Sequence, residues 1–96
     1  MLSVHEYRLY PGEHEYAFPD GARILNVGVR DGQSFMWALV DPNAKPTPRR
    51  ILVVGTDHEI DRDPAYVHFI GAIHMVANLG LVFHVFEMAA PRPAHT

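Results

Sequence analysis

Hydrophobic residues along this chain occur in short runs that are separated by glycine, proline and aspartate. The central run, Ile51 to Val54, is apolar at every position and ends at Gly55. A continuously apolar run of this length is typical of a strand that is covered on both faces. The polar sequence Gly55-Thr56-Asp57-His58 then predicts a turn. We interpret the remainder of the chain as sheet arranged around this central strand.

The clearest local signal is a hairpin before the central strand. The runs Ile24 to Arg30 and Gln33 to Val40 flank the pair Asp31-Gly32. This pair is favoured in two-residue type I′ turns, because both positions tolerate a positive φ. The spacing therefore predicts two antiparallel strands joined by a tight turn.

The predicted turn also sets which residues of the hairpin face each other. Phe35 should lie opposite Gly28, and Trp37 opposite Asn26. Their face mixes aromatic and polar groups and also carries Ile24, Arg30 and Leu39. The other face is predicted to be the core face and to carry Leu25, Val27, Val29, Ser34, Met36 and Ala38.

Proline and glycine divide the chain around the hairpin. Strands are predicted over Val4 to Tyr10 and His14 to Phe18, with turns at Pro11-Gly12 and Pro19-Asp20-Gly21. After the hairpin, Lys45-Pro46-Thr47-Pro48 predicts a stiff connector, because each proline removes a hydrogen-bond donor and fixes φ. The central strand then begins at Arg50, and residues 59–63 predict an acidic loop.

The segment Tyr66 to Leu79 carries signals for both helix and strand. Asp63, Pro64 and Gly80 would serve as the N-cap, first position and stop of a helix. The β-branched and aromatic residues around Gly71 favour a strand instead, and a central glycine weakens a helix. We favour a strand from about Tyr66 to His74 and keep the helix as the alternative.

The C-terminal part completes the predicted fold. Leu81 to Met88 predicts a strand, and residues 89–96, which contain two prolines, predict a flexible tail. Residues 1–88 are expected to form a single all-β domain, a compact antiparallel β-sandwich or small barrel of about seven short strands with little or no helix. Because so many strands are apolar on both faces, we also expect a homo-oligomer, most simply a two-fold dimer.

Composition limits the environment and the partners. The net charge of −3 disfavours non-specific binding to nucleic acid. The chain has no cysteine, and its N-terminal part carries charges that interrupt any secretory leader. No apolar stretch is long enough and free enough of polar residues to predict a membrane span. We expect a cytoplasmic protein that has no membrane partner.

Metal binding and catalysis have weak sequence support. The chain has seven histidines, but no compact ligand motif, and His68 and His84 could meet only if the register of the last two strands placed them on one face. We therefore expect no metal and no other cofactor. The chain also lacks a nucleophile elbow, a phosphate-binding loop and a Rossmann motif. An enzyme, for example a small hydrolase that uses Asp57, His58 and Glu59 for acid–base chemistry, is the less favoured alternative.

A binding site for a small phosphate-bearing ligand is the favoured functional interpretation. Gly55 and Thr56 can present backbone N–H groups and a hydroxyl to an anion. Arg49 or Arg50 would add charge, and Trp37 with Phe35 could stack on a planar ring. The predicted ligand site consists of Trp37, Arg50, Gly55, Thr56 and His58. Each of these features is also common in purely structural roles, as core, turn or solvated edge.

Several segments resemble a family of short uncharacterised proteins that are common in bacteriophage and prophage genomes. Members are similar in the patterns Trp-Ala-Leu-Val-Asp, Gly-Thr-Gly-His-Pro-Ile, Phe-Ile-Gly-Thr and Leu-Val-Phe-His-Val-Phe-Glu. The matching segments here are residues 35–42, 54–60, 69–72 and 81–87. Asp57 and Glu59 stand where the pattern has glycine and proline, so the turn after the central strand departs from it.

The resemblance supports a strand rather than a helix over residues 69–73. It also implies a phage accessory protein, although the family carries no settled function. Proteins of that class and size often bind a nucleotide signal used in host defence, or block a host protein. The sequence thus favours a non-catalytic binding protein that sequesters a nucleotide-like ligand, with a protein-binding or virion-associated module as the alternative.

Overall fold

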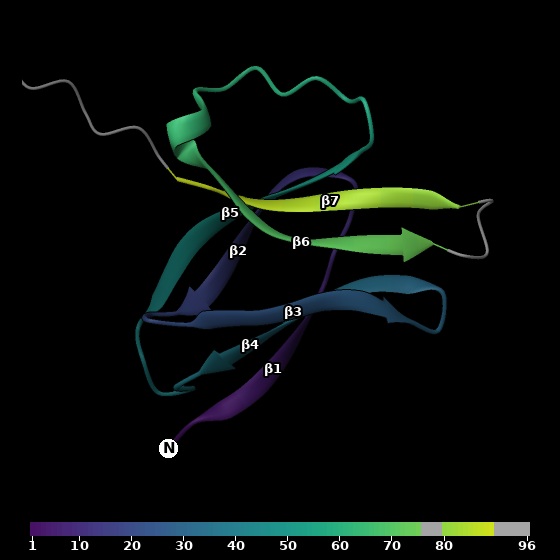
Figure 1. Cartoon of the computed structure of the whole chain (residues 1–96). Helices are drawn as coiled ribbons and strands as arrows, with labels where there is room; N and C mark the ends of the chain where they lie inside the picture. The colour runs from purple at the N-terminus through teal and green to yellow at the C-terminus, as the bar shows by residue number, and fades with distance from the viewer. Residues whose placement is uncertain (76–79, 90–96) are drawn as a thin grey trace, which may run out of the picture.

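Two antiparallel sheets pack face to face in the computed structural model of the chain, which describes residues 1–75 and 80–89 (Figure 1). The first sheet has the strand order β1 (Ser3–Arg8), β4 (Gln33–Val40), β3 (Arg23–Arg30). The second sheet has the order β2 (Gly12–Pro19), β5 (Pro46–Gly55), β7 (Leu81–Met88), β6 (Val67–Met75). The predicted small all-β sandwich of seven strands is confirmed.

The hairpin β3–β4 forms around the predicted turn. Asp31 has φ 53° and Gly32 has φ 74°, as a type I′ turn requires. Phe35 pairs with Gly28 and Trp37 with Asn26, so the predicted register is correct over the half of the hairpin next to the turn.

A β-bulge at Leu25 changes the second half of that register. Beyond it Ile24 pairs with Ala38 and Arg23 with Leu39. One extra residue in a strand exchanges its two faces, because side chains alternate. Ile24 therefore packs against the core, and the side chain of Leu25 is 47% exposed. The predicted positions of these two residues were the reverse, and the structure corrects both.

The proline-rich segment before the central strand is itself strand. β5 begins at Pro46, and Pro46 and Pro48 pair with Pro19 and Ala17 of β2. β7 pairs with β5 only from Arg50 onward, so this part of β5 has a neighbour on one side only. A strand edge tolerates residues without an N–H group. The predicted connector is wrong for that reason.

The helix signals before β6 serve a single turn of 3-10 helix. This turn, η1, spans Pro64–Tyr66, and the carboxylate of Asp63 accepts a hydrogen bond of 2.9 Å from the backbone N–H of Ala65. β6 follows directly and runs to Met75. The strand prediction for this segment is therefore confirmed over its described residues. The predicted flexible tail falls almost wholly on residues 90–96, which lie outside the described residues.

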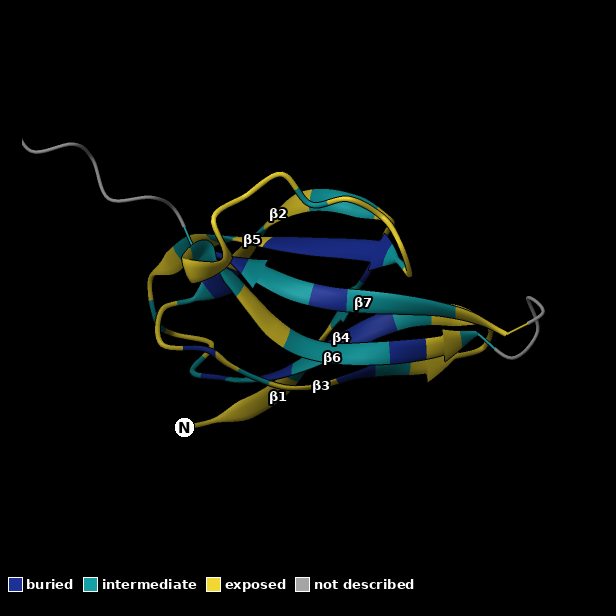
Figure 2. Ribbon diagram, turned by 45° about the horizontal axis from the view of Figure 1, so that its top comes forward, coloured by how far each residue is buried: buried dark blue, intermediate teal, exposed yellow. Residues whose placement is uncertain are grey.

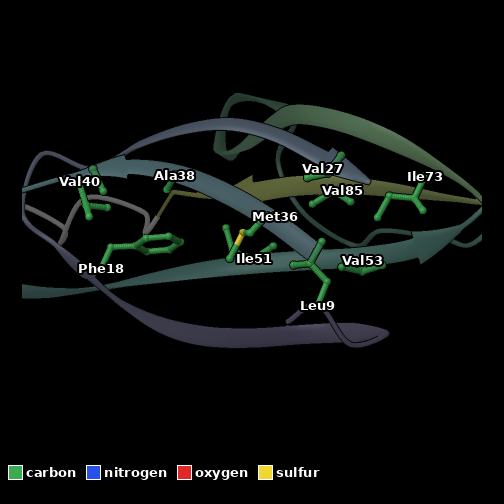
Figure 3. Close-up of a cluster of buried hydrophobic side chains, with 11 residues drawn as sticks. Leu9, Phe18, Val27, Met36, Ala38, Val40, Ile51, Val53, Ile73 and Val85 are labelled. Atoms are coloured by element: carbon green, nitrogen blue, oxygen red, sulfur yellow. The ribbon is translucent and has the colours of Figure 1, made fainter. Parts of the chain in front are cut away.

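The main core lies between the sheets and contains side chains from both (Figure 3). Phe18, Met36 and Val85 are fully buried there. The inward-facing residues of β5 complete it, as the alternation of a sandwich requires. The central position of β5 is thus confirmed.

A second, smaller cluster covers the outer face of β5. Its buried members are Leu52, Val54 and Met88, and Ile60 of the loop between β5 and β6 packs on them. Figure 2 shows this loop as a largely exposed segment. The outward apolar residues of the central strand are therefore buried within one chain. Among the described residues, no helix is long and apolar enough to cross a membrane.

Candidate functional site

A charged pair lies where the two sheets meet near the starts of β3 and β6. The guanidinium of Arg49 donates two hydrogen bonds to the carboxylate of Glu87, from Nε at 2.5 Å and from Nη2 at 2.7 Å. Its Nη1 donates to the backbone oxygen of Ala22 at 2.6 Å. These contacts hold the guanidinium across the sheets, from β5 to the residue before β3.

The environment of Arg49 keeps its side chain charged and immobile. The side chains of Arg49 and Glu87 are only 24% and 26% exposed. The carbon Cζ of Arg49 lies 4.8 Å from the ring centroid of Phe18, as in a cation–π contact. The hydrogen bonds to Glu87 raise the pKa of Arg49 above its ordinary value, against the opposing effect of burial. Arg49 is thus a fixed positive group in the wall of the site.

A hollow of about 340 Å³ opens beside this ion pair. We call it the intersheet cleft. Its polar groups are the guanidinium groups of two arginines, one imidazole and one carboxylate, and its other walls are apolar. The residues that line it are Ala22, Arg23, Ile24, Arg49, His68, Phe69, Ile70 and Glu87. A volume of this size is within the range of small-molecule sites.

One residue at the rim of the cleft has a charged group available for a ligand. Arg23 forms no ion pair with any other described residue. Phe69 also borders the cleft, but its ring packs against that of Phe86 on the outer face of the second sheet. Arg23 also borders a second hollow, which Asp20 and Asp41 line. These two carboxylates make the second hollow less suited to an anion than the cleft is.

The structure does not bring the sequence-predicted site together. Trp37 lies on the outer face of the first sheet, where its indole Nε1 donates to Glu6 at 3.0 Å. Arg50 lies on the outer face of the second sheet and pairs with Glu13, with Nε and Oε2 2.6 Å apart. The two residues are on opposite outer surfaces of the sandwich, so they cannot share one ligand.

Gly55, Thr56 and His58 do lie together, in the turn that ends β5. The N–H of His58 donates to the carbonyl oxygen of Gly55 at 3.3 Å, and the turn places Asp57 at φ 68°. Arg50 is five residues from Gly55 along an extended strand, about 17 Å at the usual rise per residue. It therefore supplies no charge to this turn, and the predicted anion site lacks its cation.

The turn also forms a side-chain hydrogen bond that was not predicted from the sequence. The hydroxyl of Thr56 and Nε2 of His84 are 2.9 Å apart, in a hydrogen bond whose direction depends on the tautomer. The pairing of Val54 with His84 brings them together, although the two hydrogen-bonded residues are far apart in sequence. The two residues come from separate segments of the chain, and no local sequence signal links them.

The histidines of β6 and β7 lie on both faces of the second sheet. His68 pairs with Glu87 on the inner face, and His84 pairs with Ala72 on the outer face. They therefore point in opposite directions. Within residues 1–75 and 80–89, no group of three or more histidine and acidic side chains is placed to hold a metal ion.

The cleft also was not found from the sequence. Its residues come from four segments whose proximity depends on how β3 and β6 are placed at the edges of the two sheets. Arg49 of β5 and Glu87 of β7 come from segments that are far apart in the sequence. Only the register between those strands shows that they pair with each other.

Comparison with known proteins gives one match. A family model described as a domain of unknown function, DUF7352, matches residues 1–96. No curated protein and no solved structure matches the chain. The match covers the whole sequence, and the chain therefore belongs to the DUF7352 family.

Proposed function

We propose that this protein is a small, non-catalytic binding protein and that its ligand occupies the intersheet cleft. The observation that carries the proposal is the meeting of Arg23 and His68 at one hollow that also contains the Arg49–Glu87 pair. Because Arg23 forms no ion pair with the described residues, it can bind an anion without breaking an existing ion pair.

The chemistry of these groups favours a nucleotide-like ligand. The guanidinium of Arg23 is suited to a phosphate or carboxylate, which it can bind through two parallel hydrogen bonds. The side chains of Ile24 and Ile70, which also line the cleft, can pack against the face of a planar base. His68 and Glu87 can exchange hydrogen bonds with polar edges of that base. This proposal keeps the ligand class expected from the sequence and moves its site from Trp37 and Gly55 to the cleft.

The resemblance to phage and prophage proteins supports a more specific role. Under this proposal the protein is a phage accessory protein that sequesters a nucleotide-like signal used in host defence. The argument is an analogy between proteins of one class. It adds a reason to test signalling nucleotides first.

A thermal-shift screen with mono- and cyclic nucleotides tests the proposal. A ligand present at a hundred times its dissociation constant stabilises the native state by about 2.7 kcal/mol. We expect at least one nucleotide to raise Tm in the native protein and to lose that effect in Arg23→Gln. Lys45→Gln is the matched control, because it removes one exposed positive charge outside the cleft. The control variant should respond as the native protein does.

Two results would overturn the proposal. One is the absence of stabilisation by every nucleotide in the panel. The other is an equal loss of response in Arg23→Gln and Lys45→Gln, which would indicate a general charge effect. A protein-binding or virion-associated module would then be the better account, because Phe69 and its neighbours form an exposed apolar surface.

A further inference from the structure

The outer face of the β6–β7 pair carries no formal charge. Its cross-strand pairs are made only of apolar residues, alanine and histidine. The four pairs are Val67 with Met88, Phe69 with Phe86, Ala72 with His84, and His74 with Val82. These described positions of β6 and β7 thus contain no aspartate, glutamate, lysine or arginine. A charge-free patch of this kind is unusual on a water-exposed sheet.

Part of this face is open to water. At one end of the face Met88 is buried in the outer cluster, against which Ile60 of the loop between β5 and β6, Val67 and Phe86 pack. Phe69 is 63% exposed, and its ring centroid lies 5.7 Å from that of Phe86 in an edge-to-face arrangement. Figure 2 shows the exposed and half-buried stretches of β6 and β7 side by side. Covering these rings would remove apolar surface from water.

We infer that a second copy of this chain covers this face, through a two-fold axis that passes near Phe69. An isologous interface opposes each surface group with an identical surface. A face with unpaired charges would repel itself in that arrangement, whereas this face has none. The net charge of −3 strengthens this argument, because two copies of the chain repel each other wherever their acidic groups come together.

The polar groups on the face also complement themselves. Thr56 and His84 are hydrogen-bonded to each other, and His74 lies farther along β6. A hydroxyl and a neutral imidazole each can donate and accept a hydrogen bond. Identical groups of this type can therefore pair across a two-fold axis, which two lysines or two glutamates cannot do.

The outer face of the first sheet shows the contrast. There Glu6 and Arg30 form an ion pair at 2.5 Å, and the guanidinium of Arg30 lies 4.6 Å from the ring centroid of Phe35. Phe35 is 9% exposed, so its ring is already covered within the chain. An anionic lipid surface is a poor occupant of the β6–β7 face, because such surfaces attract lysine and arginine.

Light scattering coupled to size-exclusion chromatography tests the inference, on the full chain over a micromolar concentration series. We expect the native protein to have twice the chain mass of 10.8 kDa and Phe69→Glu to have the mass of one chain. Val4→Glu is the matched control, because Val4 is 55% exposed on a strand of the other sheet. It should remain a dimer. Far-ultraviolet circular dichroism verifies that each variant is folded.

Ala72→Glu is a second variant on the same face. It allows the same test if Phe69→Glu does not fold. The inference is wrong if the native protein has the mass of one chain throughout the series. It is also wrong if the folded variants on β6 remain dimeric, or if Val4→Glu dissociates as they do. None of these readouts involves a nucleotide, so the result is independent of the ligand proposed for the cleft.

Discussion

Gly71 of β6 faces Val27 of β3 so closely that a Cβ atom at position 71 would lie 2.8 Å from Cγ2 of Val27. β3 and β6 are edge strands of different sheets, and they run side by side (Figure 1). Only glycine allows the two backbones to approach this closely at the point where the sheets meet. The intersheet cleft opens beside the first residues of the same two strands.

Gly71→Ala should lower the free energy of unfolding by about 1 to 3 kcal/mol, because the added methyl group overpacks the contact with Val27. Urea denaturation measures this change. Gly55→Ala is the control, since no atom lies within 4 Å of a Cβ atom built there. It should leave the stability nearly unchanged.

The double variant Gly71→Ala with Val27→Ala identifies the cause. If the clash is with the side chain of Val27, the loss in the double variant should be clearly smaller than the sum of the two single losses. Simple additivity would show that the alanine is harmful for another reason.

The ion pair between Glu6 and Arg30 predicts a dependence on pH. Hydrogen bonds from Arg30, and then from Trp37, hold the pKa of Glu6 below its ordinary value of 4.5. Because the folded pKa is lowered, the stabilisation is present above pH 4.5 and is lost as the pH falls through the lower folded value. Glu6→Gln should be less stable than the native protein at neutral pH, and the difference should vanish in acid. Urea denaturation of the native protein and of Glu6→Gln, at neutral and at acidic pH, measures this difference in stability. Glu59→Gln, which changes an exposed carboxylate, is the control.

Tyr16 connects β2 with the end of β1. Its hydroxyl donates to the backbone oxygen of Arg8 at 2.6 Å. Tyr16→Phe should therefore lower the free energy of unfolding by about 1 kcal/mol. Chemical denaturation measures this loss, and Tyr10→Phe, at an exposed ring, should show almost none.

The same residue predicts behaviour at alkaline pH. Burial raises the pKa of Tyr16 above its ordinary value of 10.0. The neutral phenol is thus favoured by folding, and its contribution is complete below pH 10 and lost as the pH rises through the folded pKa. Stability should fall less steeply in Tyr16→Phe than in the native protein above that pH. Equal slopes would contradict the assignment.

Asp57 occupies the left-handed region, with φ 68°. Glycine adopts this conformation freely, and aspartate tolerates it better than alanine does. Asp57→Ala should cost about 1 kcal/mol, whereas Asp57→Gly should be as stable as the native protein or more so. Thermal unfolding of the two variants compares them directly.

Local sequence patterns predicted most of the strands, but they did not always predict which side chains of a strand face the core. The Asp31-Gly32 turn predicted the hairpin and its nearby register, because turn chemistry is a property of adjacent residues. The bulge at Leu25 has no such local signature, and it reverses the faces of the residues before it. Asp63 and Pro64 supported only the less favoured helix alternative, and in the structure they begin a single 3-10 turn, because strand-forming residues follow.

The candidate site was harder to predict because it depends on strand order. Trp37 and Arg50 could be placed on exposed faces from sequence, but the sequence does not say that those faces belong to different sheets. Two further contacts depend on the alignment of β5 with β7: that of Thr56 with His84 and that of Arg49 with Glu87. That alignment is set by packing across the whole sandwich, which no short window of sequence contains.

Chemical-shift mapping by nuclear magnetic resonance tests the ligand site most directly, on the native protein titrated with the nucleotide that stabilises it most. Ligand binding in the intersheet cleft predicts the largest changes in the backbone amide signals of Arg23, Ile24, His68 and Phe69. Changes concentrated at Thr56 and His58, or at Trp37, would contradict the account, and so would a titration that moves no signal.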